Sequence, residues 1–323
     1  MKFLVCTAGF ALLLIFSAIS SEPARAGGET DLTVFAAGTL AVPFRELDKV
    51  FEQEHADVVV QPEFGGSVMM ARRITDLHHR ADVFAAADYH VIPKYLFGAD
   101  GGKNYADWYV GFAGNAITFA YTAKSRYARD VTADNWYKVL ARPGVAIGRS
   151  NPNTDPSGYQ TLQMLSLAAK FYADPGLAAG ILANAPRANM RDTETSLLSA
   201  LELGEIDYLA IYRSDAMQHG LDYVHLPARI DLSDPADEAF YKTGVAETKN
   251  GVLPGKPIVY AVTIPTNAEA PDLAAEYVAL LLGPKGQAIM ARNGFRVINP
   301  GYGAHLASMP EGIRPKLLPW PAW

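Results

Sequence analysis

The alternation of apolar and polar residues after residue 30 predicts strands and helices in turn. The short apolar runs Leu32–Phe35, Val58–Val60 and Val83–Ala85 are typical of buried strands. Between them, apolar residues recur at helical spacing over 44–51 and again over 69–77. This β-α-β-α-β order predicts an α/β fold in which helices cover a parallel sheet.

A second series of the same kind follows in the middle of the chain. Val145–Ile147 is predicted as a strand, Tyr159–Tyr172 as a long helix, and Leu197–Leu201 as part of another helix. Gly204 is placed to end that helix, because glycine readily takes the left-handed conformation found at helix C-termini. The next predicted strand is Tyr208–Tyr212.

The last third predicts a strand at Ile258–Val262 and helices at Leu273–Leu282 and Gln287–Arg292 that return to the first unit. One strand-like segment, Trp108–Tyr121, connects the two units, and the proline-rich tail Pro310–Trp323 is expected to be irregular. The pattern therefore predicts two lobes with a cleft between them. We place lobe 1 at 27–112 and 258–323, and lobe 2 at 113–257.

The first 26 residues have the pattern of a cleavable secretory signal. Lys2 precedes an apolar run from Phe3 to Ile19, and Ala24-Arg25-Ala26 follows as an A-x-A cleavage site. A membrane anchor is the weaker alternative, since the run is short for a span and ends in small residues. We expect a mature, monomeric protein in the periplasm, cleaved near Ala26.

Charge and cysteine content narrow the chemistry of the mature chain. The whole chain carries −6 and the leader +1, which leaves a mature net charge of about −7. An acidic protein is a poor partner for nucleic acid or an anionic membrane. The single cysteine, Cys6, lies in the leader, so no disulfide or cysteine-bound metal is expected.

Four short polar clusters share one place in the predicted pattern, after a strand and before a helix. They are Gly38-Thr39, Gly65-Gly66-Ser67, Asp155-Pro156-Ser157-Gly158 and Thr193-Glu194-Thr195. Ligands of open α/β sheets bind beyond the carboxyl ends of the strands. Helix N-termini at that edge offer free N–H groups and partial positive charge to an anion. Ordinary helix capping is the alternative interpretation of each single cluster.

Asp155 and Glu194 fit an anion site poorly, because a carboxylate repels a bound dianion. Three interpretations remain open from the residues alone. The two acids complement helix dipoles without touching a ligand, they bind a hard cation through oxygen, or they coordinate the metal centre of an oxometallate directly.

Ten short segments of the sequence resemble, in their order, those of a known protein family. They are Ala37–Leu40, Gly66–Val68, Ala81–Val83, Ala87–Tyr89, Asp107–Tyr109, Ser150–Asn153, Asp155–Pro156, Gly158–Tyr159, Gly204–Tyr208 and Gly255–Tyr260. In this order, over about residues 32–300, they resemble the tungstate/molybdate-binding proteins of ABC transporters, in the branch first recognised in archaea. The run Asn-Pro-Asn-x-Asp-Pro-x-Gly-Tyr at 151–159 is the most specific element.

The resemblance implies a two-lobed periplasmic-binding-protein fold of type II with molybdate or tungstate in the cleft and no cofactor. It implies that Gly38, Thr39 and Ser67 donate hydrogen bonds to the ligand from lobe 1. It implies that lobe 2 contributes Asp155 with the backbone of Pro156 and Ser157 that follows it, Glu194 and Tyr212. It further implies that Asp155 and Glu194 bind the molybdenum or tungsten itself and raise its coordination towards octahedral. The implied partner is a membrane permease.

Two departures from the family pattern bear on ligand preference. Thr39 stands where serine is more frequent, and Thr154 occupies a position that is often acidic. Both leave the choice between molybdate and tungstate open.

Two rival functions remain from the sequence. A sulfate- or phosphate-type carrier could share the fold, since fold alone does not fix function. An exported hydrolase could use Asp155 and Glu194 as an acid–base pair. Among other candidates, His78 and His79 do not have metal-ligand spacing, because adjacent helical positions do not share a face, and both are expected at the surface. For Tyr212, a hydroxyl satisfied inside the protein is the alternative to a ligand contact.

Overall fold

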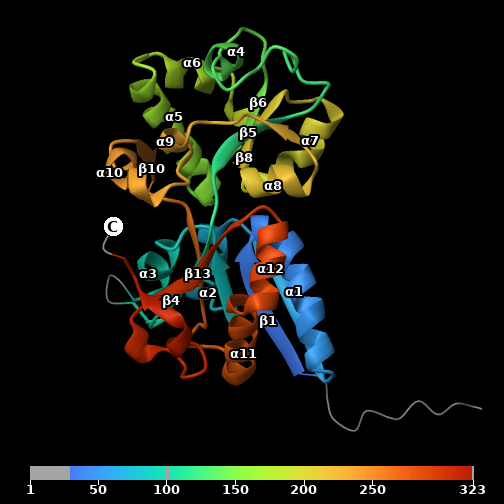
Figure 1. The fold of residues 1–323 in the computed structure, drawn as a ribbon, viewed down its shortest axis with the longest axis vertical. Helices are drawn as coiled ribbons and strands as arrows, with labels where there is room; N and C mark the ends of the chain where they lie inside the picture. Colours follow the sequence, from blue (N-terminus) through green and yellow to red (C-terminus); the bar gives the residue numbers. More distant parts are fainter. Residues whose placement is uncertain (1–29, 99–101, 250, 322–323) are drawn as a thin grey trace, which may run out of the picture.

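The computed structural model describes residues 30–98, 102–249 and 251–321. The predicted leader, residues 1–26, lies outside these described residues. Figure 1 shows two lobes, one above the other, with chain segments passing between them. Within the described ranges, no helix combines the length and apolar character that a membrane span requires.

The lower lobe in Figure 1 is built on a mixed seven-stranded sheet. Its strands, in spatial order, are β14 (Leu317–Pro319), β13 (Arg296–Ala304), β4 (Tyr109–Gly114), β12 (Val259–Thr263), β3 (Val83–Ala86), β1 (Thr30–Ala37) and β2 (Val58–Gly65). Strand β1 runs parallel to both of its neighbours, β2 and β3, as the sequence pattern predicts. The later strand β12 is antiparallel to both β3 and β4.

Among the described residues, five α-helices and three 3₁₀ turns belong to this lobe. They are α1 (Ala41–Glu54), α2 (Ser67–Thr75), α3 (Val91–Leu96), α11 (Pro271–Leu282), α12 (Pro284–Arg292), η1 (Gly38–Leu40), η6 (Leu306–Ser308) and η7 (Arg314–Lys316). The C-terminal helices pack on α1, where the Tyr277 ring meets Phe44 and Phe51 edge-on. The Tyr277 hydroxyl donates to the buried Asp48 carboxylate at 2.7 Å. The expected return of the C-terminal helices to the first lobe is confirmed.

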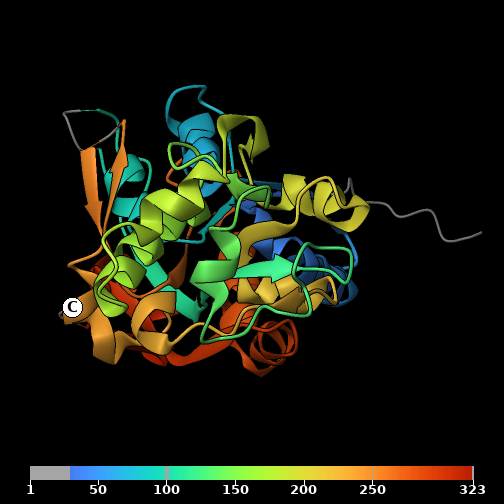
Figure 2. The same ribbon diagram turned by 90° about the horizontal axis from the view of Figure 1, so that it is seen from above.

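The upper lobe has a five-stranded sheet and a separate hairpin. The sheet order is β7 (Met190–Arg191), β6 (Ile147–Ser150), β8 (Tyr208–Tyr212), β5 (Ile117–Tyr121) and β9 (Asp222–Tyr223), and the hairpin is β10 (Val245–Thr248) with β11 (Gly251–Pro254). Its helices are α4 (Trp136–Leu140), α5 (Pro156–Phe171), α6 (Leu177–Ala183), α7 (Leu198–Leu203), α8 (Arg213–Gln218), α9 (Ala228–Asp231), α10 (Glu238–Tyr241), η3 (Arg187–Asn189), η4 (Thr195–Leu197) and η5 (Pro235–Asp237). Gly204 ends α7 at φ 82°, in the predicted left-handed conformation. Figure 2, seen from above, shows the hairpin projecting at one side of α5.

The predicted strand-like segment Trp108–Tyr121 is two strands in different sheets. β4 ends at Gly114 in the lower sheet, and β5 begins at Ile117 in the upper one. The chain therefore changes lobe between 114 and 117, and it returns between β11 and β12. The lobe limits 112/113 and 257/258 stay a prediction.

Two local predictions are wrong. α2 ends at Thr75, so His78 and His79 lie beyond the helix, although both are exposed as expected. The C-terminal tail also contains a strand, because β14 pairs in parallel with β13. Trp320 then packs against Tyr89 and Tyr109. Pairing with a sheet edge decided the tail's conformation, and proline content gave no sign of it.

Candidate functional site

The four polar clusters lie where the sequence places them, between a strand and a helix. Gly38 and Thr39 form η1 after β1, and Ser67 is the first residue of α2. In the other lobe, Asp155 precedes α5 and Glu194 precedes η4. Two clusters thus come from each lobe, at the ends where the lobes face each other.

The backbones of the two lobes meet at glycines of the first lobe. A Cβ on Gly66 would lie 2.5 Å from the Thr154 carbonyl oxygen and 3.2 Å from Asp155 Cβ. A Cβ on Gly38 would lie 3.2 Å from Thr195 Oγ1. Gly66 has φ −59°, which any residue can adopt. Glycine is therefore required at position 66 because the other lobe approaches it closely, and not because of its backbone conformation.

The two first-lobe hydroxyls are buried and already oriented by the protein. Ser67 Oγ accepts a hydrogen bond from the backbone N–H of Ala87 at 3.0 Å, so its own proton remains to be donated. Thr39 Oγ1 lies 2.9 Å from the hydroxyl oxygen of Tyr260. Both side chains are held in place before any ligand arrives.

In the second lobe, one hydroxyl joins the two carboxylates. Ser157 Oγ lies 3.1 Å from Asp155 Oδ2 and 2.8 Å from Glu194 Oε2. Ser150 Oγ lies 2.6 Å from the same Ser157 oxygen. Pro156 is the first residue of α5, where its fixed φ favours the start of a helix.

Both carboxylates are almost completely buried, with exposed fractions of 4% for Asp155 and 2% for Glu194. Burial, and then the neighbouring Glu194 carboxylate, raises the pKa of Asp155 well above its usual value. Among the described residues, no ion pair joins either acid to a lysine or arginine. A buried acid without a neighbouring cation is costly to ionise, which agrees with the raised pKa of Asp155.

Plain helix capping does not explain these acids. Asp155 and Glu194 stand at N-cap positions, yet neither side chain accepts a capping hydrogen bond. The backbone N–H of Ser196 instead bonds to Thr193 Oγ1 at 3.3 Å. The two carboxylates are thereby left directed at the serine cluster.

Tyr212 ends β8 and is fully buried. Its hydroxyl donates to Gln160 Oε1 at 2.6 Å, so the satisfied-tyrosine alternative describes this conformation. Its ring packs edge-on against Tyr260, with the ring centroids 5.8 Å apart. A contact between Tyr212 and a ligand stays a prediction.

Four buried polar residues near this site were not identified from the sequence: Asn115, Ser214, Asp215 and Tyr260. Tyr260 and Ser214 both bond to the side-chain amide of Asn115, at 3.2 and 2.8 Å. Burial and then Glu194 raise the pKa of Asp215 well above its usual value, which places this third acid near the pair. Asp215 lies in the first turn of α8, directly after β8. The strand-to-helix rule that found the four clusters could have found it.

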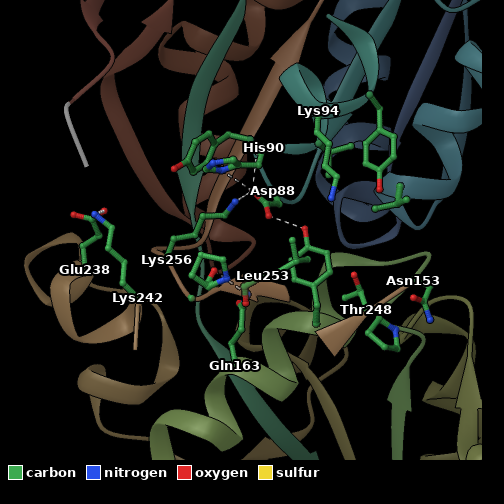
Figure 3. A pocket seen from close by; sticks show the side chains of 18 residues that line it. Asp88, His90, Lys94, Asn153, Gln163, Glu238, Lys242, Thr248, Leu253 and Lys256 are labelled. Carbon is green, nitrogen blue, oxygen red and sulfur yellow. Dashed lines mark hydrogen bonds and ion pairs between the residues drawn. The ribbon is translucent and has the colours of Figure 1, made fainter. Parts of the chain in front are cut away.

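A separate cavity of about 230 Å³ lies between the lobes. Figure 3 shows its wall, which includes Lys94 from one lobe and Gln163 from the other. None of the eight predicted site residues lines it. The predicted site is an enclosed polar cluster, and the cavity is a different feature of the same interface.

Comparison with known proteins identifies close relatives. A family model described as bacterial extracellular solute-binding protein matches residues 32–296. An uncharacterized solute-binding protein of Petrotoga mobilis is 39% identical over 291 residues, covering 88% of this chain and 89% of that protein. The molybdate/tungstate-binding protein WtpA of Thermococcus kodakarensis is 38% identical over 339 residues, covering 94% of this chain and 93% of that protein.

Solved structures share the fold at low sequence identity. The periplasmic molybdate-binding protein of Azotobacter vinelandii superposes with a TM-score of 0.60 and 20% identity, over 82% of this chain and 98% of that one. The sulfate-binding protein SubI of Mycobacterium tuberculosis gives 0.58 and 15%, over 84% and 88%. These confirm the two-lobed periplasmic-binding-protein fold. The chain belongs to the bacterial extracellular solute-binding protein family, together with the archaeal-type relatives that its sequence resembles.

Proposed function

We propose that this protein captures molybdate or tungstate outside the cytoplasm and delivers it to an ABC-type uptake permease. The relatives named for molybdate and tungstate binding, which cover nearly the whole chain, support this function. The export signal cleaved near Ala26, the monomeric state and the docking on a permease belong to the same proposal. The protein acts as a carrier and performs no chemistry on its ligand.

The observation that carries the proposal is the buried carboxylate pair joined by one serine. Asp155 and Glu194 both lie within hydrogen-bond distance of Ser157 Oγ, in a site closed to solvent. Around sulfate, two such acids only repel the ligand. Molybdenum and tungsten accept additional oxygen ligands, so the same two acids bind the metal and the repulsion is offset by coordination. In this proposal Asp155 and Glu194 are the metal ligands within the bound oxyanion.

The remaining predicted residues supply donors to the oxo groups. α2 begins at Ser67 and α5 at Pro156, so the free N–H groups and positive dipole ends of both helices face the junction between the lobes. The hydroxyls of Thr39, Ser67 and Ser157 and the backbone at Gly38 complete the set, with Tyr212 behind it. Burial strengthens each of these contacts because water no longer competes.

The rival functions fit this geometry less well. In a sulfate or phosphate carrier, two acids that face the ligand would only repel it. The TM-score with the sulfate-binding protein indicates a shared fold and nothing about the ligand. A carboxylate-pair hydrolase needs space for a substrate and a water between the acids. Here both acids share one serine hydroxyl and are nearly inaccessible to solvent.

Isothermal titration of the ligand-stripped mature chain tests the proposal. Tight one-to-one binding of molybdate and tungstate, with no heat from sulfate, is the expected result. Binding of sulfate in preference to both would contradict the coordination argument. If none of the three anions binds, the proposed function is wrong.

A further inference from the structure

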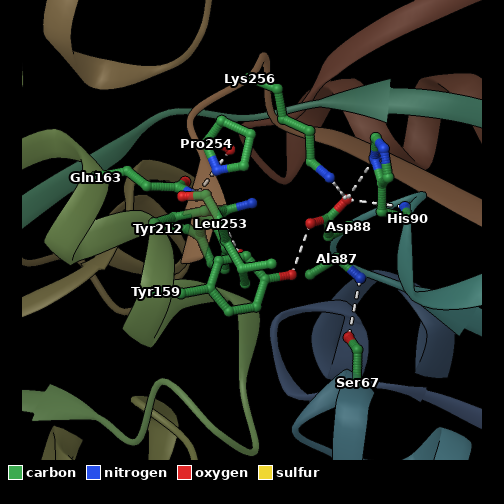
Figure 4. A network of polar contacts seen from close by, with 11 residues as sticks. Ser67, Ala87, Asp88, His90, Tyr159, Gln163, Tyr212, Leu253, Pro254 and Lys256 are labelled. Carbon is green, nitrogen blue, oxygen red and sulfur yellow. Dashed lines mark hydrogen bonds and ion pairs between the residues drawn. The ribbon is translucent and has the colours of Figure 1, made fainter. Parts of the chain in front are cut away.

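Three of the sequence segments that carry the family resemblance lie outside the predicted ligand set and meet at one carboxylate. Asp88 Oδ2 accepts a hydrogen bond from the Tyr159 hydroxyl at 2.6 Å. Asp88 Oδ1 lies 3.1 Å from Lys256 Nζ and accepts the backbone N–H of His90 at 2.9 Å. Figure 4 shows these contacts converging on Asp88. The three segments are 87–89, 158–159 and 255–257.

The contacts at Asp88 bridge the two lobes. Asp88 follows β3 of the seven-stranded sheet, and Tyr159 lies in α5 beside the five-stranded sheet. Lys256 lies between β11 and β12, on the segment by which the chain returns from one lobe to the other. Movement of the lobes apart would therefore break the bond between Tyr159 and Asp88.

This network is also tied to the predicted ligand site on both sides. The backbone N–H of Ala87, the residue before Asp88, donates to Ser67 Oγ. Tyr159 lies two residues after Ser157, in the same first turns of α5. Both ends of the bridge are thus anchored next to residues proposed to hold the oxyanion (Figure 4).

The Asp88 carboxylate is buried and charged. Burial alone would raise its pKa, but Lys256, His90 and the Tyr159 hydroxyl outweigh that effect and hold the pKa of Asp88 below its usual value. A buried ion pair adds little net stability, but it costs much to leave one partner unpaired. The ion pair of Asp88 with Lys256 therefore favours the arrangement of the two lobes in which both partners are in contact.

The interface beside Asp88 is not completely filled by side chains. The cavity of about 230 Å³ lies there, and Asp88, Tyr159 and Lys256 form part of its wall (Figure 3). Where side chains leave a void, few dispersion contacts hold the lobes together. The polar bridge therefore adds directed contacts to an apolar cluster that includes Val68 and Tyr89 of one lobe and Tyr159 and Ala246 of the other.

We propose that Asp88, Tyr159 and Lys256 form a latch that holds the lobes closed over the bound oxyanion. The three residues are positioning residues, which set the closed population and touch no ligand. The inference rests on the proposed function for the identity of the ligand. Since apparent affinity scales with the fraction of protein in the binding-competent state, loosening the latch weakens every ligand by the same factor.

Tyr159→Phe tests the latch by removing one hydroxyl. The matched control is Tyr277→Phe, which removes the same kind of bond to buried Asp48 inside a single lobe. We expect Tyr159→Phe to weaken both molybdate and tungstate about 10-fold, mainly through faster release, with their affinity ratio unchanged. Tyr277→Phe should lower the melting temperature and leave affinity unchanged. Asp88→Asn, which also removes the charge opposite Lys256, should weaken binding more than Tyr159→Phe.

Lobe closure is measured separately from ligand binding. Spin labels at Leu77→Cys and Leu203→Cys, exposed sites in different lobes, report the interlobe distance in a mature chain without other cysteines. The latch predicts a larger open fraction for Tyr159→Phe than for wild type. Equal open fractions in the two proteins, with or without molybdate, would overturn the latch. Failure of wild type to bind any of the oxyanions would instead overturn the proposed function, while a difference in open fraction would still support the latch.

Discussion

Two groups of buried acids lie at the same interface between the lobes, and their electrostatic surroundings are opposite. Asp88 is matched by a lysine, a tyrosine hydroxyl and a backbone N–H, and its pKa lies below the usual value. Asp155 is accompanied by a second acid and by serine hydroxyls, and its pKa lies well above the usual value. Burial is nearly equal, so the neighbours decide the difference.

The contrast is between a carboxylate that is paired with a cation, at Asp88, and carboxylates that have no ion pair with a lysine or arginine of the described residues, at Asp155 and Glu194. A carboxylate whose charge is already compensated holds parts of the protein together. Buried carboxylates without a cation store unfavourable electrostatic energy, which a ligand with an electron-poor centre releases. Under the two proposals, a carboxylate supports closure at Asp88, and the carboxylates of Asp155 and Glu194 coordinate the ligand.

The sharpest test of this contrast removes the charge of the site acids. Asp155→Asn and Glu194→Gln should each weaken molybdate binding by at least about 100-fold, which is ~2.8 kcal/mol at 1.4 kcal/mol per tenfold. The loss of a metal ligand is the physical reason. Titration calorimetry measures it, with Asp48→Asn as a control at a buried acid remote from the site. Unchanged affinity in both site variants would rule out metal coordination.

The second test blocks the approach of the lobes at a glycine. Gly66→Ala places a Cβ 2.5 Å from the Thr154 carbonyl oxygen, so the lobes must stay further apart and binding should weaken about 10-fold or more. Gly38→Ala should have a smaller effect, since its Cβ would meet the Thr195 side chain at 3.2 Å. Gly180→Ala, whose nearest neighbour is 3.4 Å away, is the control. Equal affinities across the three variants would contradict the closed geometry.

The smallest effect concerns the stability of the ligand-free protein. Because the folded protein raises the pKa of Asp155, it holds a proton more readily than the unfolded chain. Stability should therefore fall as pH rises from about 4, the ordinary value, through the raised pKa. Asp155→Asn does not titrate, so it should melt above wild type at about pH 8, by ~2–4 °C for each kcal/mol relieved.

Thermal melts of the ligand-free proteins at several pH values check this last expectation. Asp48, Asp215 and Asp231 also have raised pKa values, so the difference between variant and wild type, rather than either curve alone, isolates Asp155. A difference that is constant with pH would mean that Asp155 is ionised in the folded protein at all of them.

Much of the fold was predictable from local patterns. The helical spacing of Phe44, Leu47 and Phe51 predicted α1, and the apolar runs predicted β1, β3, β8 and β12. Gly204 marked the end of α7. These predictions succeeded because helix and strand burial impose a periodicity on nearby residues. The division of 108–121 into strands of two sheets, and the edge strand β14, depend on distant partners and were missed.

The candidate site was predictable in part for the same reason. Residues at strand-to-helix junctions converge in this kind of sheet, so Thr39, Ser67, Asp155 and Glu194 could be named from their positions. Asn115 and Tyr260 could not, because they reach the site from the crossing segment and from the antiparallel strand β12.

By itself, the sequence determined which residues form helices and strands, which turns carry polar groups, and that the chain resembles oxyanion carriers. Only the tertiary structure decided how the acids differ. Asp88 and Asp155 are the same letter in the sequence. The pKa of Asp88 is lowered by Lys256 and by Tyr159, which is 71 positions away in the sequence, whereas burial and Glu194 raise the pKa of Asp155. Electrostatic energy depends on distance and burial in space, and these exist only after the two lobes have come together.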